Sequence, residues 1–245
     1  MWCISFEGDP AEARRTLETL PADIFVRAAA APPRLLVADM DSTMITVECI
    51  DELADYAGVK PQVARITERA MRGELDFAAS LRARVALLAG LHEDVLARCH
   101  DERVRITPGA RTLVRTLRAR GVRTMLVSGG FTFFAERVAA EIGFDACRAN
   151  RLGISAGKLD GTVAEPILGA EAKRAALLGE GFDPAAAIAI GDGANDVPML
   201  EAAGFAIAYH GKPAAIVAAD AAVRFGDLTA VLHALGVPRR EWVTN

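Results

Sequence analysis

Three short stretches of polar residues each follow an apolar run, and together their side chains could bind a cation and an anion. They are Asp39-Met40-Asp41-Ser42-Thr43, Ser128-Gly129-Gly130 and Gly191-Asp192-Gly193-Ala194-Asn195-Asp196. The carboxylates could hold a metal ion, and the serine hydroxyl and glycine N–H groups could hold an anion. Any one stretch is weak support for a site. All three at the ends of expected strands are strong support, because ligands of open α/β sheets bind at the carboxyl ends of strands.

The four carboxylates of the first and third stretches predict a divalent metal site. Asp39 and Asp41 are two positions apart, so an extended chain would turn both toward the same side. Taken alone, the pair is explained as well by a helix N-cap and a turn aspartate as by a binding site. If Asp192 and Asp196 join it, each like-charged pair at ~4 Å costs about 4 kcal/mol at an effective dielectric constant of 20. Mg²⁺ would neutralise the cluster, since it binds one or two carboxylates and keeps positions for water and phosphate oxygens.

Ser128-Gly129-Gly130 and Lys173 are the candidates for binding the anion. A glycine pair by itself is more often a tight turn, and a lysine at a helix start is usually a solvated surface residue. Beside a carboxylate cluster, however, both fit a phosphoryl group that is held by a hydroxyl, backbone N–H groups and an ammonium. The third stretch does not indicate a dinucleotide site, because it lacks the third glycine of the G-x-G-x-x-G motif and follows the third strand.

The pattern of apolar residues predicts strands that alternate with helices. Uninterrupted apolar runs fit strands that are buried on both faces of a parallel sheet. The predicted strands are 35–38, 124–127, 186–190, 204–208 and 221–225. The predicted helices between them are 110–120, 133–142, 170–180, 196–203 and 213–218. This alternation indicates a doubly wound α/β fold.

A helical block interrupts the alternation between the first two strands. Residues 46–105 contain no convincing strand and predict helices at 48–57, 61–71, 77–88 and 92–99. This block is too long for an ordinary α/β connection. We therefore expect an inserted helical cap at 46–105 and an α/β core at 34–45 and 106–245. Gly-rich turns predict a hairpin within 149–165, and residues 1–33 are expected to be a short segment with a helix at 10–20 and a linker.

Composition and charge exclude several functions. The chain has 28 basic and 32 acidic residues, a net charge of −4, which disfavours general binding to nucleic acids or anionic membranes. The longest uncharged stretch, 124–135, is shorter than the ~18 residues of a membrane span. The acidic start is unlike a signal peptide, so a cytoplasmic protein is expected. Cys3, Cys49, Cys99 and Cys147 are too scattered for a disulfide framework or a zinc ribbon.

The polar stretches resemble the motifs of the haloacid dehalogenase (HAD) superfamily. Asp39-Met40-Asp41-Ser42-Thr43 is similar to its D-x-D-x-[TV] signature, and the second stretch, Lys173 and the third stretch resemble its other motifs. Longer matches at 47–52, 69–77, 80–85 and 128–136 resemble the members of the superfamily that hydrolyse O-phosphoserine, and the similarity continues to about residue 227. The resemblance implies a HAD-like, Rossmann-type core, a helical-bundle cap, and the last reaction of serine biosynthesis.

The resemblance also implies a role for each matching residue. Asp39 corresponds to the nucleophile and Asp41 to the general acid/base. Asp39, the backbone carbonyl of Asp41 and Asp192 correspond to the Mg²⁺ ligands, with Asp196 in support. The other matches are to residues that contact the phosphate or the rest of the substrate, namely Ser128, Gly129, Lys173 and Asn195, the cap residues Glu48 and Arg84 for the serine ammonium and carboxylate, and Met71 and Phe77, which line the cap.

Helical geometry supports Arg84 independently. The expected helix has an apolar face formed by Phe77, Leu81, Val85 and Leu88. Arg84 borders this face, whereas Arg82 points well away from it. An arginine at such a border either snorkels to solvent or pairs with an anion, and a zwitterionic substrate below it favours pairing.

Two alternatives to hydrolysis of phosphoserine stay open. The same fold could act on another small phosphorylated amino acid, or transfer the phosphoryl group to homoserine. A non-catalytic phosphoserine sensor could use the same pocket, but simple binding needs no nucleophile, so Asp39 and Asp41 together disfavour it. Bacterial relatives often carry a longer N-terminal regulatory domain, and residues 1–33 are too few for one, so feedback control through such a domain is not expected. The expected partner is a small-molecule substrate, with no nucleic acid or membrane.

Overall fold

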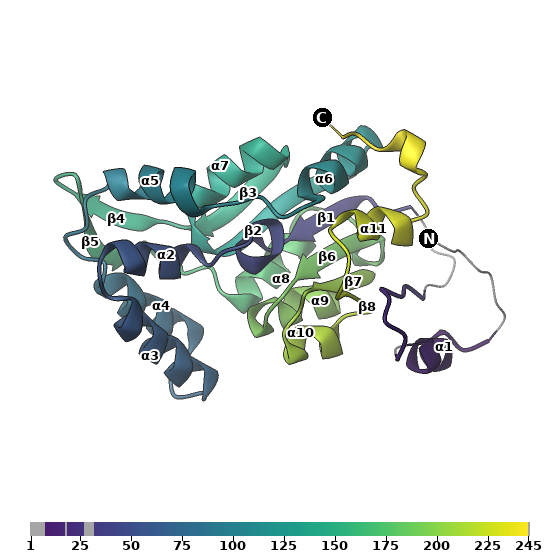
Figure 1. Cartoon of the computed structure of the whole chain (residues 1–245), viewed down its shortest axis with the longest axis horizontal. Helices are drawn as coiled ribbons and strands as arrows, with labels where there is room; N and C mark the ends of the chain where they lie inside the picture. Colours follow the sequence, from purple (N-terminus) through teal and green to yellow (C-terminus); the bar gives the residue numbers. More distant parts are fainter. Residues whose placement is uncertain (1–7, 18, 27–31, 245) are drawn as a thin grey trace.

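Six parallel strands form one sheet at the centre of the molecule, in the order β3-β2-β1-β6-β7-β8 (Figure 1). The structure is a computed structural model, and it describes residues 8–17, 19–26 and 32–244. The strands are β1 (Leu35–Ala38), β2 (Arg123–Phe131), β3 (Ala146–Asn150), β6 (Ala187–Gly191), β7 (Phe205–Tyr209) and β8 (Ala221–Val223). From β1 the chain first adds β2 and β3 on one side and then β6, β7 and β8 on the other. The connections on the two sides of such a switch point run in opposite directions and leave a crevice at the carboxyl ends of the strands.

Helices cover both faces of this sheet. On one face lie α6 (Ala110–Ala119), α7 (Thr132–Ile142) and α11 (Thr229–Ala234), and on the other lie α8 (Ala170–Leu178), α9 (Val197–Ala202) and α10 (Pro213–Ala218). Alternate residues of β1 divide between the two layers: Leu36 and Ala38 pack with the first set, and Leu35 and Val37 with the second. The prediction of strands buried on both faces in a doubly wound α/β fold is therefore confirmed.

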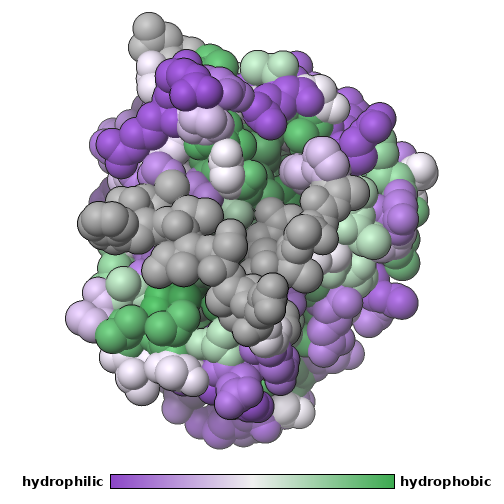
Figure 2. Space-filling view, turned by 90° about the vertical axis from the view of Figure 1, so that its right-hand side faces the viewer, coloured by the Kyte–Doolittle hydropathy of each residue, from purple (hydrophilic) through white to green (hydrophobic). Residues whose placement is uncertain are grey.

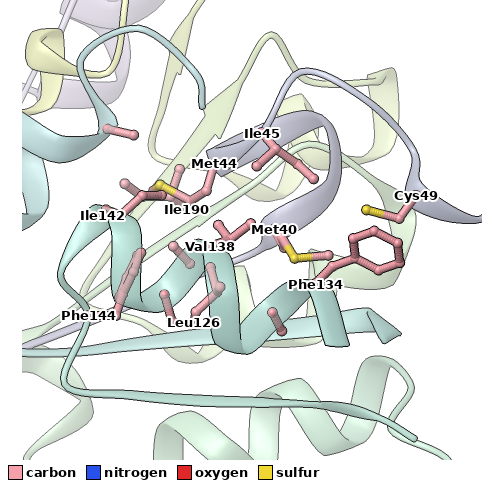
Figure 3. Close-up of a cluster of buried hydrophobic side chains, with 14 of the residues drawn as sticks. Met40, Met44, Ile45, Cys49, Leu126, Phe134, Val138, Ile142, Phe144 and Ile190 are labelled. Atoms are coloured by element: carbon pink, nitrogen blue, oxygen red, sulfur yellow. The ribbon is translucent and has the colours of Figure 1, made fainter. Parts of the chain in front are cut away.

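The segment that follows β1 carries Asp39 and Asp41 at the edge of the core. A short turn, Met40–Met44, follows the strand and is closed by the Ile45 N–H, which donates to Met40 O at 3.0 Å. Met40 and Met44 are fully buried. Figure 3 shows both methionines in a cluster with side chains of α7, among them Phe134 and Val138. Burial of Met40 fixes the backbone between Asp39 and Asp41, so neither acidic residue can shift without exposing apolar surface.

The predicted helical block is present between β1 and β2. It consists of α2 (Cys49–Tyr56), α3 (Lys60–Met71), α4 (Phe77–Ala86) and α5 (Asp94–Arg103). The chain enters and leaves the block through two paired segments: Ile45 and Ile106 form an antiparallel bridge. The Thr46 N–H donates to Arg105 O, and the Thr107 N–H donates to Met44 O, both at 3.0 Å. Residues 46 and 105, the predicted limits of the block, are thus hydrogen-bonded to each other, and the division into core and cap stays a prediction.

The predicted hairpin consists of β4 (Leu152–Ser155) and β5 (Lys158–Val163), which pair antiparallel. It lies against the helical block, because the Gly90 N–H donates to Leu159 O at 2.8 Å and the Leu159 N–H donates to Leu91 O at 2.9 Å. These hydrogen bonds connect the hairpin to the segment between α4 and α5. The predicted core range includes 149–165, and within it the hairpin at 152–163 contacts the helical block, whereas Asn150 binds core segments.

Two elements were not predicted. Strand β3 contains Arg148 and Asn150, and three of its five residues are only partly buried, so it has no apolar run to reveal it. Helix α11, of six residues, was the other element missed. The N-terminal helix was predicted and is α1 (Pro10–Leu17), while Cys3 and residues 27–31 of the predicted linker lie outside the described residues.

On the face of the molecule opposite the helical block, hydrophilic side chains predominate among the coloured residues (Figure 2). Figure 2 shows this face, at the right of Figure 1, where smaller hydrophobic patches lie between hydrophilic side chains. Within the described part of the chain, no helix combines the length and apolar character needed to cross a membrane. The cytoplasmic location stays a prediction.

Candidate active site

Asp39 and Asp41 lie at the carboxyl end of β1, at the centre of the sheet. The Asp39 N–H donates to Ile190 O of β6 at 2.9 Å, which continues the strand pairing to the end of β1. The Asp39 side chain is buried. Burial and the neighbouring Asp196 carboxylate raise the pKa of Asp39 to about 8, and the Lys173 ammonium opposes this shift. A cation bound at the cluster would also oppose it and favour the ionised, nucleophilic form.

Asp41 occupies a different environment. Its Oδ2 atom accepts a hydrogen bond from the Cys49 N–H at 3.3 Å, at the start of α2. Its Oδ1 atom is buried and has no hydrogen-bond partner in the described part of the chain. Burial, then the charges of Glu48 and Asp39, raise the pKa of Asp41 well above its ordinary value. This carboxyl group is therefore suited to carry a proton.

Three buried carboxylates form an acidic cluster. Oxygen atoms of Asp39, Asp192 and Asp196 all lie within 4.8 Å of one another. Asp196 is fixed by two backbone donors, since its Oδ2 atom accepts from the N–H groups of Asp192 at 3.1 Å and Gly193 at 3.0 Å. A Cβ on Gly191 would lie 2.4 Å from the Asp196 carboxyl carbon, so only glycine at 191 permits this approach. The all-oxygen donor set fits a hard cation such as Mg²⁺.

Two lysines contact the cluster. Lys173 of α8 is fully buried, and its Nζ atom lies 2.5 Å from Asp39 Oδ1 and 2.7 Å from Asp196 Oδ1. Burial alone would lower the pKa of Lys173, but the two carboxylates outweigh it and raise the pKa above its ordinary value. Lys212, just before α10, places its Nζ atom 2.9 Å from Asp192 Oδ2 and is 59% exposed. One ammonium therefore lies inside the cluster and the other at its edge.

Ser128, Gly129 and Gly130 lie at the carboxyl end of β2, beside the acidic residues. The Gly130 N–H donates to Ser128 Oγ at 2.9 Å. A Cβ on Gly130 would lie 3.1 Å from Ser128 Oγ and 3.2 Å from Asp41 Oδ2. Glycine at 130 therefore allows the serine hydroxyl and the Asp41 carboxyl to approach each other.

Glu48 and Arg84 extend over this group from the helical block. The Ser42 hydroxyl donates to Glu48 Oε1 at 2.8 Å, and Ser42 adopts a left-handed conformation with φ 54°. Arg84 of α4 donates from Nε to Ser80 O at 3.3 Å. Burial lowers the pKa of Arg84, and the carboxylates of Asp51 and Glu48 oppose this shift. The helical block thus contributes one anionic and one cationic side chain near the acidic residues.

The ring of Phe77 lies between Gly129 and Gly169, which belong to two different segments of the core. A Cβ on Gly129 would lie 2.8 Å from its Cζ atom, and a Cβ on Gly169 would lie 3.1 Å from its Cδ1 atom. Phe77 begins α4, whereas both glycines belong to segments of the core. The absence of side chains at these two positions lets the helical block approach the core.

One cavity of about 790 Å³ brings most of the predicted residues together. This volume is typical of a small-molecule site. The predicted residues that line it are Asp39, Asp41, Glu48, Met71, Phe77, Arg84, Ser128, Gly129, Asp192 and Asn195. Lys173 and Asp196 do not line it in the described part of the chain, and lie behind Asp39 instead. Met71 is 81% exposed, at the mouth of the cavity.

Sequence reasoning missed three residues that contribute to the site. Ser42 orients Glu48, Asp51 lines the cavity near Arg84, and Lys212 contacts Asp192. Lys212 follows the carboxyl end of β7, so the rule that ligands bind at strand ends could have indicated it. Ser42 lies in the first polar stretch and Asp51 in the 47–52 match, but no role followed for either residue from its position.

Comparison with known proteins connects this arrangement to a family. A family model described as haloacid dehalogenase-like hydrolase matches residues 36–201. A relative from a Polaromonas species, named phosphoserine phosphatase, is 46% identical over 209 residues, which cover 82% of this chain and 89% of the relative.

Solved structures agree with this result. A structure described as a phospho-aspartyl intermediate analogue of phosphoserine phosphatase has a TM-score of 0.77 and 37% identity, and the match covers 83% of this chain and 99% of that one. A probable phosphoserine phosphatase from Vibrio cholerae has a TM-score of 0.81 and 38% identity, over 96% of this chain and 75% of that one. The chain therefore belongs to the phosphoserine phosphatases among the haloacid dehalogenase-like hydrolases.

Proposed function

We propose that this chain hydrolyses O-phosphoserine to serine and phosphate through an aspartyl-phosphate on Asp39. The observation that carries the proposal is the composition of the cavity. Its lining brings Asp39, Asp41 and Ser128 together with one anionic and one cationic side chain of the helical block, Glu48 and Arg84. Phosphoserine has the complementary groups, because it carries a phosphoryl group at one end and an ammonium and a carboxylate at the other.

The buried acidic cluster supports a requirement for Mg²⁺. Asp39, Asp192 and the backbone carbonyl of Asp41 would hold the ion, and Asp196 would support it. When bound, Mg²⁺ would neutralise charge on the phosphoryl oxygens and on the carboxylates around them. Lys173 would add a fixed positive charge behind Asp39, which its Nζ atom contacts.

In the first half-reaction, Asp39 is the nucleophile and Asp41 the acid. A carboxylate oxygen of Asp39 attacks the phosphorus atom, and the bond between phosphorus and the serine oxygen breaks. Asp41 donates its proton to that oxygen, so serine leaves as a neutral alcohol. The raised pKa of Asp41 supports this role, because an ordinary aspartate would hold no proton near pH 7.

In the second half-reaction, water releases the phosphate. The Asp41 carboxylate, now deprotonated, accepts a proton from a water molecule while the oxygen of that water attacks the phosphorus atom. The acyl phosphate bond breaks and Asp39 returns to its carboxylate form. The Ser128 hydroxyl, the N–H groups at Gly129 and Gly130 and the Asn195 amide would hold the phosphoryl oxygens through both steps.

The helical block would select the substrate. We propose that residues 46–105 act as a cap over the core, and that the hairpin at 152–163 moves with it because it contacts this block. Glu48 would receive the serine ammonium and Arg84 the serine carboxylate, as a planar guanidinium binds a carboxylate through two parallel hydrogen bonds. Phe77 and Met71 would enclose the apolar part of the substrate and limit access of water.

The direct test is phosphate release from phosphoserine, phosphothreonine and p-nitrophenyl phosphate, with Mg²⁺ or with excess chelator. We expect the highest kcat/KM for phosphoserine, and no turnover in chelator. Homoserine should be added as an acceptor in a parallel reaction. Formation of phosphohomoserine at a comparable rate would identify a phosphotransferase, and binding of phosphoserine without turnover would identify a sensor.

A further inference from the structure

Asn150 is a buried polar residue that belongs to none of the motifs and takes no part in the proposed mechanism. It ends β3 and is 3% exposed. Its Nδ2 atom donates to Gly129 O at 2.9 Å and to Leu168 O at 3.1 Å, and its Oδ1 atom accepts from the Leu168 N–H at 2.7 Å. Both amide protons and the amide oxygen therefore bind backbone groups, and these belong to two separate core segments.

The first of these segments carries the serine hydroxyl of the cavity. Because a trans peptide group directs its C=O and N–H to opposite sides, holding the Gly129 carbonyl toward Asn150 turns the Gly130 N–H away from it. That N–H donates to Ser128 Oγ at 2.9 Å. The serine oxygen thus accepts one hydrogen bond from the backbone, and its own proton stays free to donate into the cavity.

The second segment carries Lys173. Leu168, whose N–H and C=O both bind Asn150, directly precedes Gly169, the N-cap of α8. The same amide therefore fixes the distance between Gly129 and the start of α8. The Phe77 ring lies between Gly129 and Gly169, so this distance also sets the width of the slot that receives the ring.

We propose that Asn150 is a positioning residue for phosphoryl binding, acting through the Gly129–Gly130 peptide group on Ser128. This inference rests on the proposed function, in which Ser128 holds the phosphoryl group. Without Asn150, the Gly129 carbonyl would lose its buried partner, and the peptide group would rotate toward other donors. The Gly130 N–H would then no longer hold the serine oxygen in its orientation.

The test compares Asn150→Ala and Asn150→Asp with a matched control, Thr124→Val. Aspartate keeps the shape and the acceptor for the Leu168 N–H, but its ionised form cannot donate to either carbonyl. Thr124 is a buried residue of the same strand pair at the opposite end, where its Oγ1 atom donates to Asp145 Oδ2 at 3.0 Å and accepts from the Asp145 N–H at 3.1 Å. Thr124→Val thus removes a comparable buried link between β2 and the start of β3, away from the site.

We expect both Asn150 variants to lower kcat/KM about tenfold to hundredfold, by the same factor for phosphoserine and p-nitrophenyl phosphate, because both substrates carry the phosphoryl group. Inhibition by inorganic phosphate should weaken in parallel. In a Ser128→Ala background, Asn150→Ala should cost less than about threefold, since the group it positions is gone. Thr124→Val should change kcat/KM less than about threefold, whatever its effect on the melting temperature.

Each other outcome has a definite meaning. Equal losses from Asn150→Ala with and without Ser128 would overturn the positioning role. So would unfolding of both Asn150 variants at the assay temperature while Thr124→Val stays folded, because Asn150 would then serve the stability of the fold. Wild-type chain that does not turn over phosphoserine would contradict the proposed function itself, and this is measured before any variant.

Discussion

At the scale of single residues, Asp39 and Asp41 have the same side chain but different surroundings. Asp39 contacts an ammonium at 2.5 Å, whereas Asp41 lies beside Glu48 and has a carboxyl oxygen without a partner in the described residues. We therefore expect Asp39→Asn to abolish turnover. Asp41→Asn should slow formation or breakdown of the intermediate, since the amide can neither donate a proton to serine nor accept one from water.

The measurement is to quench the reaction with labelled phosphoserine in acid and to map the phosphorylated peptide. The label should lie on Asp39 in the wild type and be absent in Asp39→Asn. Ser128→Ala serves as the control: it should weaken binding but still show label on Asp39. Label on Ser128 in the wild-type chain would contradict this mechanism.

The sequence predicted which residues come together at the site better than it predicted their contacts. Lys173 was identified through its family resemblance as a phosphate contact, and the structure places it between Asp39 and Asp196, 134 and 23 positions away. No local pattern encodes such distant pairs. Asn150 was missed for the same reason, because its partners lie 21 and 18 positions away, in β2 and in the segment before α8.

At the scale of elements, helix α4 offers two arginines in different settings. Arg84 lines the cavity, whereas Arg82 pairs with Glu165 at 2.5 Å on the surface. We expect Arg84→Ala to lower kcat/KM for phosphoserine by roughly thirty- to several-thousand-fold, as for loss of one member of a buried charge pair. The loss on p-nitrophenyl phosphate, which lacks a carboxylate, should be far smaller. Steady-state kinetics on both substrates measure this difference.

Arg82→Ala is the control for this prediction. It removes the same side chain from the same helix, and an exposed ion pair contributes little to stability, so both substrates should be nearly unaffected. Glu48→Ala should likewise lower kcat/KM for phosphoserine much more than for p-nitrophenyl phosphate, because only phosphoserine has an ammonium for Glu48 to bind. Equal losses on the two substrates in Arg84→Ala would show that Arg84 supports the fold or the chemistry rather than recognition.

The elements themselves were predictable where burial leaves a pattern. Strands β1, β6 and β7 are buried at every position, and their apolar runs identified them. The edge strand β3 is only partly covered and gave no such signal. The predicted strand at 124–127 also ended too early, because Ser128 to Gly130 are typical of a turn, whereas β2 continues to Phe131. The long insertion was recognised from its length and helical periodicity, whereas the contact of the hairpin with it depends on tertiary packing.

At the scale of the whole molecule, the acidic cluster connects elements that are far apart in the chain. Asp39 follows β1, and Asp192 and Asp196 follow β6, so their approach depends on the completed sheet. Burying three carboxylates together opposes folding, and Lys173 offsets only part of that charge. A ligand that binds only the folded arrangement must stabilise the entire fold.

Mg²⁺ should therefore raise the melting temperature of the substrate-free protein. At a concentration one hundred times its Kd, the stabilisation is about 2.7 kcal/mol, roughly 5–10 °C for a chain of this size. Thermal unfolding with Mg²⁺, or with chelator at the same ionic strength, measures the shift without any catalytic step. Asp192→Asn should lose most of it, because one ligand and its charge are removed. Glu171→Gln, at an exposed position on α8, should retain the full shift. An undiminished shift in Asp192→Asn would place the ion elsewhere and remove the cluster from the proposed mechanism.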